Sequence, residues 1–410
     1  MLKKRHAAIA LVLALMLSAC TSRAAREAEE AESSGPIKIG LVAVLSGPLA
    51  EIGEAHKRGA ELAVKQINDA GGINGRSVEL QVKDEKGDPN ASVQAARELL
   101  SDGTKLIAGY TLDPDCLAAA PIINDGGGLL VGLSCQGDAL TQDSLVDNYF
   151  QIAPSNTMLA NATAKVAADS GLTSWQGIGP DYAFGHEVWQ RFSDALVKQV
   201  PGVELRKSVY VPLEATQVAP YINSLIADLP ADSAKTTGLF MSTFSATTIG
   251  LAQQGEAYGF FDKYGEVLNL GGSTPTAEAL KADTPPITFV YDYFDEAYDN
   301  PTNTTFVEGY RAAYGNSRPN AWAYEGYVAV LAIKAAIEKA GSSNADEVAE
   351  AMKGLRFDGP KGNLEFRAED HLLMSPVTAW KVVGNSNNPE GFDVLFSRAI
   401  PAEEVAPSVS

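Results

Sequence analysis

Hydrophobic and polar positions change their spacing repeatedly along the chain from Pro36 onward. Residues 37–44 form an apolar run of strand length, and the segment that follows has Ala60, Ala63 and Ile67 on one helical face. The same alternation predicts further strands at 77–82, 105–109, 129–133, 175–179, 203–211, 238–241 and 266–270. Between them it predicts helices at 91–100, 116–124, 156–169, 187–199, 219–227 and 247–258.

Strands separated by helices of this length are typical of parallel sheets with helices on both faces. The alternation restarts after Pro154, which predicts an α/β fold with two doubly wound lobes. In such sheets ligands bind beyond the carboxyl ends of the strands. We therefore expect a site among the loops at 46–53, 110–115, 134–138, 180–186, 242–245 and 271–276.

The first twenty residues have the pattern of a secretory signal. Lys3-Lys4-Arg5 precedes an apolar run at 7–17, which is short for a membrane span of ~20 residues. The run ends in Leu17-Ser18-Ala19-Cys20, which resembles the lipobox of bacterial lipoproteins. We predict a signal peptide at 1–19 and lipid attachment at Cys20; the alternative is an ordinary signal in which this cysteine is incidental. The acidic segment 20–35 has almost no large apolar residues and is expected to be a flexible tether.

The amino-acid composition of the chain argues against several classes of function. The chain has 410 residues, with 51 Asp and Glu against 32 Lys and Arg, for a formal net charge of −19. So acidic a protein repels the phosphate backbone, which argues against nucleic-acid binding. Three Cys and four His are too few for a zinc-ribbon type of site, and we expect no metal or cofactor. Because no later segment is long and apolar enough for a membrane span, the body is expected to be extracytoplasmic.

Two cysteines remain in the body of the chain, Cys116 and Cys135. Outside the cytoplasm, cysteine pairs commonly form disulfides. We predict a bridge between them; the alternative is two buried thiols.

Motifs of known catalytic sites are incomplete in this sequence. Residues 132–137 miss the Gly-x-Ser-x-Gly nucleophile elbow by one position. His186-Glu187 begins the zinc-protease motif, but Gln190 stands where the second histidine is needed. For His56, His186 and His371 we expect helix-capping or surface positions. The sequence therefore indicates a protein that is not an enzyme; the alternative, a surface-anchored hydrolase, requires a Ser, a His and an acid to converge in the site.

Several motifs, taken in order, resemble one known family. Residues 45–53, 59–63, 68–75 and Asp88-Pro89 resemble the opening of type 1 periplasmic binding proteins. Asp181-Tyr182-Ala183-Phe184-Gly185 is similar to the D-Y-A-Y-G stretch of that family, and residues 306–315 and 323–327 are similar to its later helices. The resemblance extends from Pro36 to about Trp380. The group it points to is the leucine/isoleucine/valine-binding family, which delivers substrate to ABC importers.

The resemblance implies two lobes joined by three crossover segments, near 151–155, 291–295 and 357–366. The first lobe would comprise 36–153 and 296–357, and the second 154–291 and 366–400. Residues 292–295 and 358–365 would be hinge crossovers. The lobes of such proteins close by hinge motion on a small solute in the cleft between them.

The resemblance also implies which residues line the cleft. Asp113 stands where amino-acid binders have a Ser that helps to hold the ligand carboxylate, and Ser134-Cys135-Gln136-Gly137-Asp138 replaces the loop that also grips it. Ser273 stands where an acidic residue usually meets the ligand ammonium. The candidate ligand-binding residues are Ile52, Asp113, Ser134, Cys135, Gln136, Tyr182, Phe184, Phe244 and Ser273.

These replacements disfavour a standard branched-chain amino acid, because Asp113 would repel its carboxylate. They favour a neutral or aromatic molecule, or a cation bound by Asp113. The alternative for Asp113 is capping of the helix that continues through Pro114. For Phe184 and Phe244 the alternative is plain core packing.

The sequence thus predicts a monomeric lipoprotein on the extracytoplasmic face of the cell membrane. It would trap a small solute, such as an amino acid, an amide or an aromatic compound. Its partners would be an ABC permease and a separate ATPase. The alternative within the same fold is a ligand-binding sensor.

Overall fold

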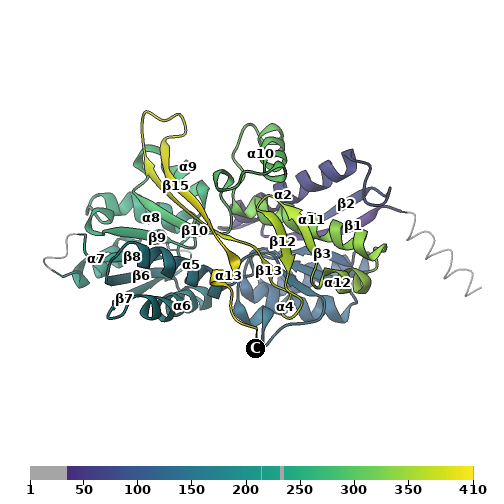
Figure 1. The fold of residues 1–410 in the computed structure, drawn as a ribbon, viewed down its shortest axis with the longest axis horizontal. Helices are drawn as coiled ribbons and strands as arrows, with labels where there is room; N and C mark the ends of the chain where they lie inside the picture. Colours follow the sequence, from purple (N-terminus) through teal and green to yellow (C-terminus); the bar gives the residue numbers. More distant parts are fainter. Residues whose placement is uncertain (1–34, 214, 231–234, 410) are drawn as a thin grey trace, which may run out of the picture.

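The computed structural model describes residues 35–213, 215–230 and 235–409, and in it the chain folds around two large sheets that lie in separate lobes (Figure 1). The predicted signal peptide, Cys20 and all of the predicted tether except Gly35 lie outside these residues. None of the described helices combines the length and the apolar content needed to cross a bilayer.

The first lobe is built on a five-stranded parallel sheet in the order β2-β1-β3-β4-β5. Its strands are β1 (Ile37–Ala43), β2 (Val78–Asp84), β3 (Leu106–Gly109), β4 (Leu129–Gly132) and β5 (Tyr149–Gln151). The helices of this lobe are α2 (Ala50–Asp69), α3 (Pro89–Ser101), α4 (Asp113–Asp125), α10 (Pro301–Ala313), α11 (Ala321–Ala340) and α12 (Ala345–Met352). A short 3-10 helix, η1 (Asp138–Thr141), follows β4.

The second lobe is built on a seven-stranded sheet in the order β15-β14-β10-β9-β8-β6-β7. Its strands are β6 (Ser174–Pro180), β7 (Glu204–Val211), β8 (Gly238–Met241), β9 (Glu266–Asn269), β10 (Ile287–Tyr291), β14 (Val377–Gly384) and β15 (Phe392–Ile400). Its helices are α5 (Asn156–Asp169), α6 (Ala183–Gln199), α7 (Ala219–Asp228), α8 (Ser245–Glu256), α9 (Thr274–Leu280) and α13 (Ala402–Val405), with 3-10 turns η2 (Phe261–Lys263), η3 (Lys281–Asp283) and η4 (Asp295–Ala297).

The two-lobed α/β fold is confirmed, but the second sheet is not wholly parallel. Strands β14 and β15 form an antiparallel hairpin, and β14 pairs antiparallel with β10. The chain enters β14 from the crossover beside the first lobe and turns back through the polar segment 385–391, so no helix separates the two strands. This hairpin gives the sheet its antiparallel edge.

The three crossings between the lobes lie close together. The chain leaves the first sheet after β5, returns after β10, and crosses again between β13 (Leu373–Met374) and β14. The last crossing differs from the expected 358–365. That segment lies in a hairpin of β11 (Arg356–Gly359) and β12 (Gly362–Phe366), which pairs with β13 in a small separate sheet. The backbone N–H of Gln151, at the first crossing, donates to the carbonyl of His371 at 3.0 Å, which ties the first crossing to the segment before β13. His371 is buried, contrary to expectation.

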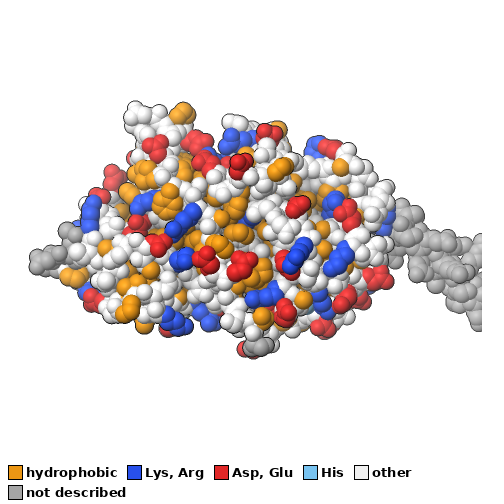
Figure 2. Space-filling view, in the orientation of Figure 1, with side chains coloured by type: hydrophobic (Ala, Val, Ile, Leu, Met, Phe, Trp, Pro, Cys, Tyr) orange, Lys and Arg blue, Asp and Glu red, His pale blue; other side chains and the backbone are white. Residues whose placement is uncertain are grey.

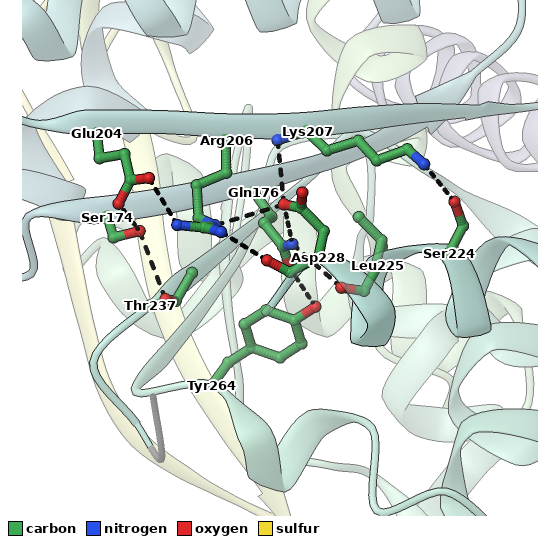
Figure 3. A network of polar contacts seen from close by, with 10 residues as sticks. All are labelled: Ser174, Gln176, Glu204, Arg206, Lys207, Ser224, Leu225, Asp228, Thr237 and Tyr264. Carbon is green, nitrogen blue, oxygen red and sulfur yellow. Dashed lines mark hydrogen bonds and ion pairs between the residues drawn. The ribbon is translucent and has the colours of Figure 1, made fainter. Parts of the chain in front are cut away.

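A polar network fixes the edge of the second sheet to α7 (Figure 3). Arg206 on β7 donates to the Asp228 carbonyl at 2.6 Å, and Gln176 on β6 donates to the Asp228 carboxylate at 2.8 Å. The hydroxyl of Tyr264 donates to the buried Gln176 side chain at 2.8 Å. The network satisfies a buried amide that would otherwise destabilise this edge.

Helices α2 and α11 pack unusually closely in the first lobe. A Cβ atom added at Gly59 would lie 1.9 Å from the carbonyl oxygen of Ala323, and one at Gly326 would lie 2.1 Å from that of His56. Only glycine permits such an approach of two helix backbones. The contact places His56 of α2 next to Glu325 of α11.

Charged side chains of both signs are mixed on the face of the molecule shown in Figure 2. On the face drawn in Figure 2, Lys and Arg are interspersed with Asp and Glu and do not gather in one basic patch. Apolar side chains also reach this face, among the polar and charged groups.

Candidate ligand site

A pocket lies between the lobes at the carboxyl ends of the strands. Its empty volume is about 450 Å³, part of which is open to solvent. The first lobe contributes side chains from the loops after β3 and β4 and from α2 and α11, and the second contributes side chains from the loops after β6, β8 and β9. Its lining comprises Ile52, Thr111, Leu112, Asp113, Ser134, Gln136, Tyr182, Phe184, Phe244, Gly271, Tyr291 and Trp322.

The structure brings together seven of the nine candidate residues at this pocket, namely Ile52, Asp113, Ser134, Gln136, Tyr182, Phe184 and Phe244. The other two lie outside its lining. Cys135 is fully buried in a disulfide, and Ser273 is buried directly before α9. The Ser273 hydroxyl has no hydrogen-bond partner within the described part of the chain.

The predicted disulfide between Cys116 and Cys135 is present, with the two Cα atoms 6.3 Å apart. It joins α4 to the loop after β4. Two strand-end loops that line the pocket are thereby linked covalently, which restricts their movement relative to each other.

Asp113 holds the same two segments together by hydrogen bonds. Its Oδ1 accepts the backbone N–H of Gln136 at 2.7 Å and that of Gly137 at 2.9 Å. Helix α4 begins at Asp113 itself, the preceding Leu112 is the N-cap, and no side chain caps this helix, so the capping alternative is wrong. Burial raises the pKa of Asp113 to about 6, although the two N–H bonds oppose the shift.

Aromatic rings form one wall of the pocket. Tyr182 and Phe184 are stacked with ring centroids 5.9 Å apart, and Phe184 meets Phe244 edge to face at 6.4 Å. The side-chain amide of Gln136 donates to the hydroxyl of Tyr291 at 3.2 Å. This bond joins a first-lobe loop to the end of β10.

Behind Ser134 lies a buried histidine and carboxylate. Nε2 of His56 lies 2.9 Å from the Ser134 hydroxyl and 3.0 Å from Oε2 of Glu325, and the Ser134 hydroxyl also donates to that oxygen. His56 is therefore neither a helix cap nor a surface residue, contrary to expectation, and it is completely buried. Burial lowers the pKa of His56 to about 3 and raises that of Glu325 to about 8.

This cluster has the residue types of a hydrolase triad but not its geometry. In a triad the acid binds Nδ1 of the histidine, which leaves Nε2 free to take the serine proton. Here Glu325 and Ser134 share Nε2, and Nδ1 of His56 has no partner among the described residues. A histidine with so low a pKa is also a weak base. The arrangement fits a positioning role for Ser134 at the pocket wall.

Five lining residues were not singled out from the sequence. Thr111, Leu112 and Gly271 lie in loops predicted to surround the site, and an added Cβ at Gly271 would lie 2.4 Å from the Ser242 carbonyl. Tyr291 ends a strand that the pattern did not predict. Trp322 lies in the first turn of α11, where only the tertiary packing of that helix brings it to the pocket.

Comparison with known proteins gives a consistent picture. The model of a family described as periplasmic binding protein matches residues 36–387. The leucine-, isoleucine-, valine-, threonine- and alanine-binding protein of Pseudomonas aeruginosa is 26% identical over 346 residues, which cover 84% of this chain and 89% of that protein.

Solved structures of similar fold include several with bound ligands. A branched-chain amino acid transporter substrate-binding protein of Streptococcus pneumoniae in complex with isoleucine has a TM-score of 0.77 at 20% identity, covering 89% of this chain and 99% of its own. A solute-binding protein of an ABC transporter from Rhodopseudomonas palustris, in complex with 3,4-dihydroxybenzoic acid, has a TM-score of 0.78 at 21% identity. The match covers 90% of this chain and 98% of that protein. With the two-lobed fold and the match to nearly the whole body, the chain belongs to the periplasmic binding protein family, as its motifs predict.

Proposed function

We propose that the protein is the solute-binding component of an ABC importer and that it binds a small molecule in the pocket between its lobes. The observation that carries this proposal is the pocket itself, since both lobes contribute side chains to its lining. A ligand there would contact both lobes and stabilise their closed arrangement. The names of the similar proteins, which describe amino-acid binding and ABC transport, support import over sensing.

The proposal includes delivery of the solute unaltered. The shared use of His56 Nε2 by Ser134 and Glu325 supports this, because it leaves no histidine nitrogen placed as a general base. The partners would be a membrane permease and its separate ATPase. The protein would act as a monomer held at the extracytoplasmic face through a lipid on Cys20, and residues 20–35 would serve as the tether.

The central experiment is small-angle X-ray scattering of the purified protein with and without small solutes, combined with calorimetric titration. We expect a bound solute to shift the scattering profile towards a more compact form, since the lobes close on it. Chemical analysis of the recovered solute should find it unchanged. A profile that stays constant while a solute binds, or conversion of the solute, would contradict the proposal.

The anchor is tested separately by metabolic labelling with a fatty acid in a bacterial host. The native chain should incorporate label and fractionate with membranes. Cys20→Ser should do neither, while Cys116→Ser serves as a control cysteine variant that keeps the label. Labelling of Cys20→Ser would exclude this site of attachment.

A further inference from the structure

The pocket has one charged side chain in its lining, and that side chain is acidic. Asp113 stands among apolar, hydroxyl and amide groups, and no Lys or Arg belongs to the lining. A ligand carboxylate bound there would therefore find no cationic partner. It would also meet a carboxylate already present, which repels it.

Asp113 already uses the backbone donors that a ligand carboxylate would need. Its Oδ1 accepts both the Gln136 and the Gly137 N–H, so these groups are satisfied within the protein. The fit is close, because an added Cβ at Gly137 would lie 3.1 Å from Cγ of Asp113. The Asp113 carboxylate thus takes the two backbone N–H groups that could otherwise bind the carboxylate of a ligand.

The second oxygen of Asp113 remains available. No donor within the described residues binds its Oδ2. The charges that act on Asp113 from neighbouring elements are those of Glu187 and Asp138, which are also negative. Arg191 lies nearby, but it pairs with Asp138 at 3.2 Å and with Glu187 at 3.4 Å. Within the described residues, no basic side chain forms an ion pair with Asp113.

The aromatic wall suits a cation with an apolar body. The rings of Tyr182, Phe184 and Phe244 offer both hydrophobic surface and π faces, which attract ammonium groups. Trp322 adds a further ring from the first lobe.

We propose that the pocket binds an organic cation, a protonated amine with an apolar or aromatic body and no carboxylate, and that Oδ2 of Asp113 accepts a hydrogen bond from its ammonium group. This inference rests on the proposed function and narrows its substrate class. Buried charges in proteins are paired, and a ligand ammonium completes the pair that the protein leaves open.

The test compares three probes of similar size and different charge by calorimetric titration at pH 7.5. They are 2-phenylethylamine, 3-phenylpropionate and L-phenylalanine. We expect the full-length protein to bind the amine at least tenfold more tightly than either carboxylate-bearing probe. Asp113→Asn keeps an oxygen for the Gln136 and Gly137 N–H groups but removes the charge, and it should weaken amine binding at least tenfold. Asp181→Asn, at an exposed carboxylate outside the lining, should leave amine binding unchanged.

Asp113→Ala gives an independent readout that needs no knowledge of the natural ligand. It frees both backbone N–H groups, so acetate at millimolar concentration should raise the melting temperature of this variant and not that of the native protein. If the native protein binds 3-phenylpropionate or L-phenylalanine as tightly as the amine, the inference is overturned and the proposed function stands. If no probe binds and no solute compacts the protein in scattering, both fail.

Discussion

The rings of Phe184 and Phe244 contact each other at the pocket, with centroids 6.4 Å apart, and both belong to its lining. Truncation of either ring removes apolar surface that a bound solute would cover. Phe184→Ala and Phe244→Ala should therefore weaken solute binding by ~1–3 kcal/mol. Titration calorimetry with a solute that binds the native protein measures the change.

A control separates binding from packing. Phe396→Ala alters an exposed ring on β15 and should leave affinity unchanged. If the two pocket variants lose stability but keep native affinity, their rings serve only the core.

The Glu325 carboxyl makes stability depend on pH. Burial raises its folded-state pKa from the usual 4.5 to about 8, so the folded protein holds this proton more tightly than the unfolded chain. The stabilisation that the protonated Glu325 gives the folded state is fully present below about pH 4.5. It is lost as pH rises through about 8. Glu325→Gln mimics the protonated form. This variant should match the native protein near pH 5 and exceed its unfolding free energy at pH 9 by on the order of 5 kcal/mol.

Urea denaturation at pH 5 and pH 9 gives the required difference. Glu338→Gln, at a half-exposed carboxyl on the same helix, should show no such dependence. An equal effect of Glu325→Gln at both pH values would mean that the residue acts by shape alone. The effect of His56 on the pH dependence of stability has the opposite sign. Because its pKa is lowered in the folded state, it reduces stability only below about pH 6.5.

At the scale of elements, Tyr264 secures the second sheet through one hydroxyl. It donates to Gln176, a fully buried amide on β6 that also holds α7. Tyr264→Phe leaves the ring in place and leaves that amide oxygen without this donor. We expect a loss of about 1–2 kcal/mol in unfolding free energy. Tyr258→Phe changes an exposed ring nearby in sequence and should be neutral, and equal effects of the two variants would exclude the network as the cause.

Some helices and strands were predicted closely from the sequence. The predicted helix 156–169 and strand 238–241 have the same bounds as α5 and β8. Helix α4 begins three residues before its predicted start, because Asp113 and Pro114 fit a first helical turn as well as a loop. Strands β5 and β13 have three and two residues, too few for a period to be recognised. β5 is identified by its pairing with β4, and β13 by its pairing with β12.

Some features of the candidate site could likewise be predicted from the sequence, and others could not. The strand-end loops follow from the topology of a parallel sheet, and ten of the twelve lining residues lie in the loops predicted for the site. The pairing of His56 with Glu325 does not follow from any local pattern. The two residues are 269 positions apart, and the contact of Gly59 and Gly326 between their helices brings them together.

At the scale of the whole molecule, a buried ion pair joins two of the three crossings between the lobes. Lys361, in the turn between β11 and β12, donates to the carboxylate of Asp292 directly after β10. The same ammonium donates to the Ser375 hydroxyl at 3.0 Å and to the Pro376 carbonyl at 2.8 Å. It also lies 4.7 Å from the centre of the Tyr324 ring. One cation thus holds both crossing segments against the first lobe.

Removal of one partner should be much more costly than removal of both, because it leaves a buried charge alone. We expect Lys361→Met to lower the unfolding free energy by about 3–5 kcal/mol, and Lys361→Met combined with Asp292→Leu to recover a large part of that loss. Lys353→Met breaks a partly exposed pair with Glu350 and should cost less than about 1 kcal/mol. Urea denaturation of the four proteins at one pH measures these differences. If the double variant is no more stable than Lys361→Met, the ammonium acts mainly through its bonds to Ser375 and Pro376, and the crossings are held without the ion pair.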